Sequence, residues 1–216
     1  MIRRVLRILY PPKCLLCQKL LDKQETDLCH SCRMEQPEFF TAKKNISFIA
    51  QWTALWYYVG DVRNCLHRFK FYGVRSHAKP LGRLLAMHLM KEGFDKVDLI
   101  TWAPISLKRN WERGYDQDKL ICKAVAKELE LPVASVLKKH RHTQAQSSLM
   151  DASQRRANVL GAYKVRDPKL VAGKRILLID DIVTTGATAS ECARTLLTAG
   201  AKEVIFAAVA ASEKYK

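Results

Sequence analysis

Residues 176–190, with the sequence ILLIDDIVTTGATAS, decide the fold class of this 216-residue chain. Their first four residues form a continuous apolar run between Lys174-Arg175 and two acids. Such a run is typical of a strand that is buried on both faces of a parallel sheet. The residues that follow it then lie at the carboxyl end of the strand, the edge of an open α/β sheet at which ligands bind.

The residues after this strand predict a site for a phosphorylated sugar. They lead into a helix N-terminus, which offers unpaired N–H groups to a phosphate, and Gly186 permits close approach of the backbone. Asp180 and Asp181 can accept hydrogen bonds from sugar hydroxyls or from the water shell of a metal ion. The alternative is a strand followed by a Thr-capped helix, which leaves two adjacent carboxylates at a buried strand end without a ligand.

This segment resembles the 5-phosphoribosyl-1-pyrophosphate (PRPP) loop of type I phosphoribosyltransferases, in which two acids and two variable residues precede Thr-Thr-Gly-x-Thr. The resemblance implies that Asp180 and Asp181 hold the ribose hydroxyls, with PRPP as ligand or substrate and Mg²⁺ as its metal. The loop residues that would bind the 5′-phosphate are Thr184, Thr185, Gly186, Ala187 and Thr188. A Walker A loop is excluded because its spacing is absent.

Four cysteines near the N-terminus have the spacing of a zinc site. Cys14 and Cys17 form one CxxC pair, and Cys29 and Cys32 form a second pair after eleven intervening residues. Four thiolates saturate one tetrahedral Zn²⁺ and leave no open position, so the spacing predicts a structural site in a segment too small to bury a core. Disulfides or a redox CxxC are the alternatives.

Composition and charge limit the class of protein. With 48% hydrophobic residues the chain can bury one α/β core with a small appendage, so we expect an N-terminal helix and zinc module over 1–45 and the main domain over 46–216. No apolar run approaches the roughly 20 residues of a membrane span, and seven cysteines fit a reducing compartment, which predicts a cytoplasmic protein. The net charge of +16 predicts a surface that attracts polyanions.

One segment, 63–79, combines cations with aromatic rings, most densely at Arg68-Phe69-Lys70-Phe71-Tyr72. Cations that follow a nucleic-acid backbone, beside rings on which bases stack, are typical of proteins that bind single-stranded nucleic acid. The alternative is that Leu66, Phe69 and Phe71 are core residues and that the cations are merely solvated.

The apolar patterns alternate between strand and helix periods. We expect a strand within 46–60, a helix over 76–93, a strand over 97–103, a helix over 116–131, a strand from 135, and then alternating strands and helices through 159–165, 175–180, 187–199 and 203–209. This alternation predicts an α/β fold with a doubly wound, mainly parallel sheet.

Two long polar connections are expected to reach the same sheet edge. The first, 104–117, contains Arg109 and Arg113, whose guanidinium groups would bind pyrophosphate. The second, 138–158, predicts a lid that excludes water and carries Arg141, with ordinary surface disorder as the alternative.

Together these features resemble the ComF family of competence proteins over nearly the whole chain. The matching motifs are Leu9-Tyr10-Pro11-Pro12-x-Cys14-x-x-Cys17, Cys29-x-x-Cys32, Phe69-Lys70-Phe71-x-Gly73, Pro104 with Arg109, Arg113-Gly114-Tyr115-x-Gln117, Arg141-x-Thr143-Gln144, Arg156-x-Asn158-Val159 and the PRPP loop. The resemblance implies a phosphoribosyltransferase-like domain with an N-terminal zinc module, and a cytoplasmic role in natural transformation. In that role the protein would assist entry of single-stranded DNA, often beside a competence helicase.

If the chain catalyses ribose transfer, the residues that would carry it are Asp180, Asp181, Arg113 and Arg141, with Arg109 near the pyrophosphate. The family usually reads Arg-Gly-Phe-Asn-Gln where this chain has Asp116, which we expect either to bind magnesium or to repel pyrophosphate. Nothing contiguous identifies a nucleobase pocket. Three functions therefore follow: a DNA-uptake factor that binds PRPP and single strands, a metabolic phosphoribosyltransferase, and a non-catalytic PRPP sensor that serves as an adaptor.

Overall fold

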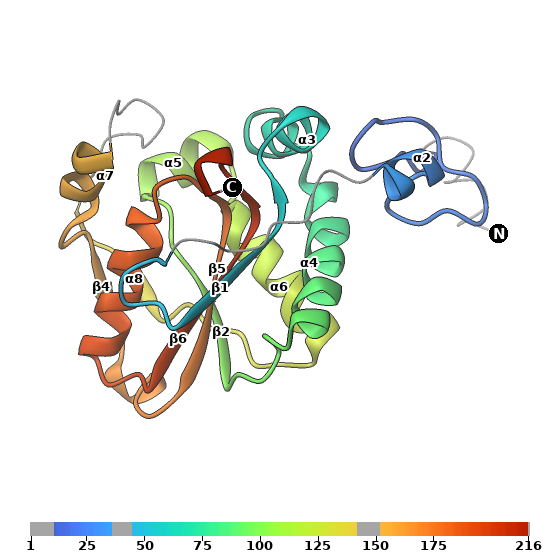
Figure 1. The fold of residues 1–216 in the computed structure, drawn as a ribbon. Coiled ribbons are helices and arrows are strands. Elements are labelled where there is room, and N and C mark those ends of the chain that lie inside the picture. The colour runs from blue at the N-terminus through green and yellow to red at the C-terminus, as the bar shows by residue number, and fades with distance from the viewer. Residues whose placement is uncertain (1–10, 36–44, 142–151, 216) are drawn as a thin grey trace.

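The computed structural model describes residues 11–35, 45–141 and 152–215. Its main feature is a parallel sheet with the strand order β1-β6-β5-β2. These strands are β1 (Gln51–Tyr57), β2 (Leu99–Trp102), β5 (Arg175–Val183) and β6 (Glu203–Ala211). Helices cover both faces of the sheet (Figure 1), which confirms the predicted α/β, doubly wound parallel arrangement.

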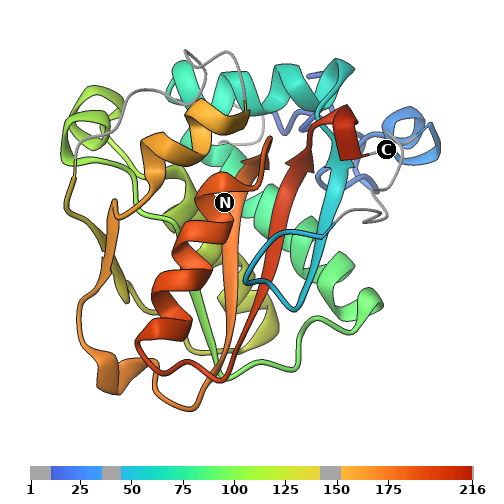
Figure 2. The same cartoon turned by 60° about the vertical axis from the view of Figure 1, so that its left-hand side comes forward.

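The side chains of β5 alternate between two cores, one on each face of the sheet. Leu177 and Ile179 pack with the helices α3 (Gly60–Phe71), α4 (Ala78–Glu92) and α6 (Gln117–Leu129). Ile176 and Leu178 pack with α8 (Ala187–Thr198), which Figure 2 shows lying across the other face. All four side chains are fully buried, as expected for a strand with neighbours on both edges and helices on both faces.

The carboxyl ends of the parallel strands meet at one edge of the sheet. β1 leads to α3, β2 leads to α5 (Leu107–Arg113), and β5 leads through a short loop to α8. Figure 1 shows α3 and α5 above this edge. Residues far apart in sequence meet there, since Lys70 and Asp181 are 111 positions apart and form an ion pair.

The structure corrects the expectation for residues 135–165. β3 (Leu137–Lys139) and β4 (Tyr163–Val165) pair with each other, antiparallel, in a separate small sheet. Helix α7 (Ala152–Val159) occupies the last part of the connection that was expected to be a lid, and the predicted lid residues 142–151 lie outside the described residues. The apolar pattern indicates that a strand exists, whereas its partner depends on the tertiary fold.

The four-cysteine segment packs against the core on the α3 and α4 face. Its side chains Leu15, Leu16 and Leu28 are buried in the same apolar cluster as those helices. Arg68 of α3 donates to the backbone carbonyls of Leu15 and Leu16 at 3.2 and 2.8 Å. The module and the sheet domain therefore share one core, while the helix expected at the N-terminus, in 1–10, lies outside the described residues.

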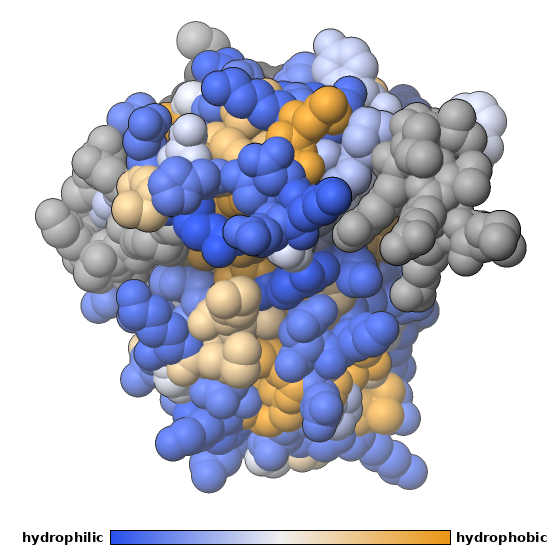
Figure 3. Space-filling view, turned by 90° about the vertical axis from the view of Figure 1, so that its right-hand side faces the viewer, coloured by the Kyte–Doolittle hydropathy of each residue, from blue (hydrophilic) through white to orange (hydrophobic). Residues whose placement is uncertain are grey.

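The face of the molecule on the side of this module is mostly hydrophilic, with smaller hydrophobic patches between (Figure 3). Helix α4 carries two exposed apolar side chains, Met87 and Met90. Within the described ranges, no helix has both the length and the apolar character to span a membrane.

Helices α4 and α6 approach each other at Gly82. A Cβ atom at this position would lie 2.3 Å from the Cβ of Ala124 and 3.1 Å from its backbone carbon. We expect Gly82→Ala to lower the free energy of unfolding by about 1–3 kcal/mol, because the helices must separate to admit the methyl group. Urea denaturation measures this loss. The control Met87→Ala changes an exposed residue of the same helix and should cost less, so equal losses would contradict the packing argument.

Candidate functional site

A cavity of about 590 Å³ opens at the carboxyl edge of the sheet, a size typical of small-molecule sites. It is lined by the end of β5, the loop that follows and the start of α8, together with parts of α3, α5 and the β3–β4 sheet. Asp180, Asp181 and all of 184–188 line it, as do Arg109 and Arg113. The structure thus gathers most of the site residues expected from the sequence around one space.

The loop between β5 and α8 offers backbone N–H groups to this cavity. Gly186 is the N-cap of α8 with φ of 71° and has no side chain to cap the helix, while the hydroxyl of Thr185 accepts from the N–H of Ala187 at 3.3 Å. A Cβ on Gly186 would lie 3.1 Å from Ile46 and from the hydroxyl of Tyr215, so both conformation and space favour glycine here. Because the first-turn residues line the cavity, the positive end of the helix dipole is available to an anion.

The two acids of β5 lie beside a third carboxylate that the sequence reasoning missed. Asp118 of α6 lines the same cavity, and carboxylate oxygens of Asp118, Asp180 and Asp181 lie within 4.8 Å of one another. The ammonium of Lys70 donates to Asp181 at 2.8 Å. Burial, followed by the charge of Asp181, raises the pKa of Asp180 to about 7, and burial with the neighbouring carboxylates raises the pKa of Asp118 well above its usual range. Burying three neighbouring carboxylates costs free energy. The cluster is therefore suited to bind a ligand that supplies hydroxyl donors, or a cation.

Cations line the same cavity. The basic side chains among its lining residues are Arg63, Lys70, Arg109, Arg113, Lys139 and Arg155. Two pairs of these cations lie near each other: burial and then the charge of Arg109 lower the pKa of Lys139, and burial and then the charge of Arg113 lower the pKa of Arg109. Cations that repel one another inside a cavity favour the binding of a multiply charged anion.

The turn after α5 is tied to the end of α3, and this contact positions Arg113. The hydroxyl of Tyr115 donates to the backbone carbonyl of Phe69. The guanidinium of Arg113 donates to the side-chain oxygen of Gln117 at 3.1 Å and lies 5.3 Å from the centre of the Phe71 ring. The motif at 113–117 therefore holds an arginine at the cavity beside an aromatic ring.

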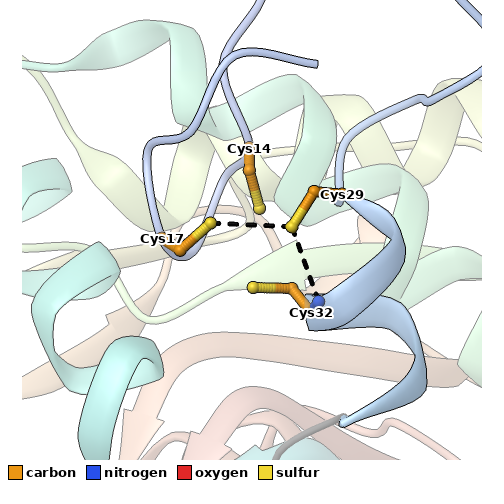
Figure 4. A group of neighbouring side chains, drawn as sticks. All are labelled: Cys14, Cys17, Cys29 and Cys32. Atoms are coloured by element: carbon orange, nitrogen blue, oxygen red, sulfur yellow. Dashed lines mark hydrogen bonds between the residues drawn. The ribbon is translucent and has the colours of Figure 1, made fainter. Parts of the chain in front are cut away.

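The four cysteines form a compact group of thiols (Figure 4). Their sulfur atoms lie within 4.8 Å of one another, and the Sγ atoms of Cys17 and Cys29 are 3.6 Å apart. Zn–S bonds of about 2.3 Å place the sulfurs of a tetrahedral site ~3.8 Å apart, so this group fits one Zn²⁺. None of the four is paired in a disulfide, and Cys14 and Cys29 are buried.

Comparison with known proteins gives two matching family models, a phosphoribosyl transferase domain over residues 120–216 and a double zinc ribbon domain over residues 5–43. Competence protein F of Haemophilus influenzae is 25% identical over 219 residues, covering 89% of this chain and 93% of that protein. Over nearly its whole length the chain is similar to this competence protein, in line with the resemblance to the ComF family. DNA utilization protein YhgH of Escherichia coli K12 is 29% identical over 151 residues, and the match spans 68% of the chain and 66% of that relative, slightly under two thirds of its length.

Two solved structures that match part of the chain are named as phosphoribosyl proteins. The glutamine PRPP amidotransferase from B. subtilis has a TM-score of 0.44 and 24% identity, over 63% of this chain and 26% of that one. An adenine phosphoribosyltransferase has a TM-score of 0.42 and 17% identity, over 70% and 77%. The fold class of this protein rests on its sheet topology and the family models rather than on likenesses of this size.

Arg141, which the ComF resemblance singled out, is not among the described residues that line the cavity. Its exposed guanidinium donates to the backbone carbonyls of Asn158 and Leu160 at 3.0 and 2.7 Å, and so it holds the end of α7. A contribution of Arg141 to ribose transfer stays a prediction.

Asp116, at which the sequence departs from the usual ComF pattern, also lies outside the cavity lining. It is the N-cap of α6, and its carboxylate accepts hydrogen bonds from the backbone N–H of Lys119 at 3.1 Å and from the indole of Trp102 at 3.2 Å. An asparagine oxygen can cap a helix equally well. The carboxylate of Asp116 therefore stabilises the start of α6. The acid of this segment that lines the cavity is Asp118, two residues later.

Lys139 is a cavity residue that makes anion binding sensitive to pH. Burial, followed by the charge of Arg109, lowers the pKa of Lys139 to about 8. The protonated form attracts an anion, so we expect the affinity for sulfate, whose charge is constant in this range, to fall as pH rises through 8, by up to about tenfold at pH 9. Calorimetric titrations at both ends of the range measure this. Lys139→Arg keeps the charge and should flatten the profile, whereas an unchanged slope in that variant would assign the effect to another group.

Proposed function

We propose that this protein is a cytoplasmic DNA-uptake factor of natural transformation that binds PRPP in the cavity and single-stranded DNA on the surface beside it. The observation that carries the proposal is the gathering of the acid pair, the start of α8 and a group of cations around one cavity. The names of two relatives, competence protein F and DNA utilization protein, support a role with DNA. All seven cysteines are free, as a reducing compartment requires.

Support for PRPP comes from the match between its parts and the chemistry of the lining. Asp180 and Asp181 can accept hydrogen bonds from ribose hydroxyls. The loop and first turn over 184–188 offer hydroxyl and N–H donors to a 5′-phosphate. Arg109 and Arg113 line the same cavity and suit the pyrophosphate. Calorimetric titration with PRPP and Mg²⁺ should give saturable binding at one site per chain, and pyrophosphate should compete with PRPP for this site. If PRPP gives no heat of binding and pyrophosphate does not compete, the PRPP proposal is refuted.

Support for single-stranded DNA comes from aromatic side chains exposed around Arg113. Phe71 and Tyr72 are 61% and 71% exposed, and the His67 ring lies 4.8 and 5.6 Å from theirs. Trp111 of α5 is 86% exposed. Exposed rings beside guanidinium groups form a surface on which bases stack.

The two interpretations of segment 63–79 each hold for part of it. Leu66 and Phe69 are fully buried, as the core interpretation expected, whereas Phe71 is largely exposed and lines the cavity. The alternation follows from helix geometry, because residues two positions apart on α3 point in different directions. Only the exposed side of α3 is therefore available to DNA.

The DNA proposal is tested by fluorescence anisotropy with an oligothymidine of about twenty nucleotides. The affinity for DNA should fall steeply as the salt concentration rises, because lysine and arginine side chains that contact the phosphates release counterions from the DNA. Phe71→Ala/Tyr72→Ala should weaken binding about tenfold at fixed salt and leave the salt dependence unchanged, since base stacking is worth ~1–3 kcal/mol per base. Met87→Ala, a control at an exposed apolar residue of α4, should bind normally. A flat salt response, or full affinity in the double variant, would count against this surface.

Phosphoribosyl transfer is the second candidate function, favoured by the phosphoribosyl transferase family match and by the basic lining. The reaction would displace pyrophosphate from the anomeric carbon through an oxocarbenium-like transition state, with Arg109 and Arg113 screening the charge of the leaving group. Release of pyrophosphate in the presence of a panel of nucleobases tests it. Inactivity with every base, together with intact PRPP binding, would leave the sensor role, in which a competence helicase is the expected partner.

A further inference from the structure

We propose that Asp118, Asp180 and Asp181 form a binding site for a hard divalent cation, such as Mg²⁺, that fills before PRPP arrives. The inference concerns the cavity of the proposed function, but it does not require PRPP to bind there. It adds Asp118, from a helix that precedes the PRPP loop by about sixty residues in the sequence, to the ligands of the metal.

The geometry brings one oxygen from each of three carboxylates together. These oxygens lie within 4.8 Å of one another, although the acids come from two different elements, α6 and β5. Two oxygens on opposite sides of a cation are separated by about 4.2 Å for Mg²⁺ and by about 4.8 Å for Ca²⁺, given their usual bond lengths. The group is therefore compact enough for one ion to reach all three carboxylates with little movement of the chain.

Asp118 itself points to a missing ligand. Its side chain is buried, with 5% exposure, lines the cavity, and has an Oδ1 atom that accepts no hydrogen bond from any described residue. A buried carboxylate oxygen without a partner costs free energy unless a bound group satisfies it. A cation held between Asp118 and the acid pair of β5 would do so.

The local charge leaves room for a divalent cation. Metal ligation requires the carboxylates to be deprotonated. In that state the three carry three negative charges, and Lys70, which contacts Asp181 at 2.8 Å, contributes one positive charge. The remainder is −3 + 1 = −2, which one divalent cation neutralises without displacing Lys70. Carboxylate oxygens are the ligands of Mg²⁺, Mn²⁺ and Ca²⁺, and the four-cysteine group is the one that suits zinc.

Mn²⁺ titration of the zinc-loaded protein, followed by electron paramagnetic resonance in the absence of PRPP, tests the inference. We expect one Mn²⁺ per chain that excess Mg²⁺ displaces. Asp118→Asn, which keeps the shape of the side chain, should weaken Mn²⁺ binding at least tenfold. Glu112→Gln removes the same charge from a half-exposed residue of α5 and should leave binding unchanged. Unchanged zinc content and melting temperature show that each variant is folded.

The outcomes separate this inference from the PRPP proposal. Mg²⁺-dependent PRPP binding by a protein that takes up no Mn²⁺ alone would overturn the inference and leave the PRPP proposal in place. Mn²⁺ binding that persists in Asp118→Asn would overturn the inference as well. Mn²⁺ binding that depends on Asp118, without any PRPP binding, would support the inference and remove the PRPP proposal.

Discussion

The double replacement Asp180→Asn/Asp181→Asn is expected to weaken PRPP binding at least about 100-fold. Each carboxylate would lose charge-assisted hydrogen bonds to ribose hydroxyls, which contribute ~1.5–3 kcal/mol each, and the two losses multiply in the binding constant. Calorimetric titration with PRPP and Mg²⁺ measures the change. The matched control Asp22→Asn/Asp167→Asn removes the same charge at two exposed positions and should bind PRPP like the unmodified protein.

This variant also removes the ion-pair partner of Lys70, so its folding has to be measured alongside binding. Lys70 contacts Asp181 at 2.8 Å, and an ammonium left without a partner in a buried place destabilises a fold. A melting temperature within a few degrees of the unmodified protein would show that lost affinity reflects the site. PRPP binding within threefold of normal in a folded double variant would show that these acids do not hold the ribose.

The same variant tests whether the PRPP cavity and the DNA surface are coupled. If PRPP changes the affinity for an oligonucleotide by some factor, linkage requires that the oligonucleotide changes the affinity for PRPP by the same factor. Phe71 and Arg113 line the cavity and also belong to the exposed aromatic surface, so a physical connection exists. Loss of PRPP binding in the double variant should abolish the effect of PRPP on DNA while leaving DNA affinity in its absence intact.

Replacing Cys14 with serine is expected to cause the largest loss of stability. Zinc content should fall from about one per chain to nearly none, because a structural site needs all four thiolates. The melting temperature should fall by more than ~10 °C, since metal binding contributes many kcal/mol to folding and each lost kcal/mol lowers it by ~2–4 °C in a chain of this size. The effect should reach the sheet domain, because Leu15, Leu16 and Leu28 share its core.

Elemental analysis and calorimetry measure these two quantities. Cys192→Ala serves as the control, because Cys192 is buried in the core of the α8 face and belongs to no cysteine group. This variant should keep its zinc. Full zinc content in Cys14→Ser, or an unchanged melting temperature, would contradict the structural role assigned to the four-cysteine group.

Features encoded over a short stretch were predictable from the sequence. The strand β5, the Thr/Gly loop and the start of α8 follow one another within 175–198, and their residue types are decided by local requirements: burial on both faces, a positive φ at Gly186 and free N–H groups. The spacing of the cysteines is local in the same sense. The helix α3 was not among the expected helices, although it had a local signal, since Val62, Cys65, Leu66 and Phe69 recur at helical spacing and are all buried.

Features that join distant segments were not predictable in this way. Asp118 reads in the sequence as an ordinary acid in the first turn of α6, where a carboxylate favours the helix dipole. Its place beside Asp180 and Asp181 depends on the packing of α6 against β5, and the Lys70 contact depends on α3 reaching the same edge. No spacing rule connects residues that are separated by whole elements.

The sequence by itself determined the α/β class, the strand-loop-helix unit that can hold a phosphate and the four-thiol group that fits zinc, because each depends on neighbouring residues. The tertiary structure alone decided which charges surround the cavity. It brought Asp118, Lys70 and Lys139 to the lining, placed Asp116 in a helix cap and turned Arg141 to the backbone of the α7 end. The physical reason is that electrostatic interaction depends on distance in space, and the parallel sheet sets that distance by collecting the ends of its strands at one edge.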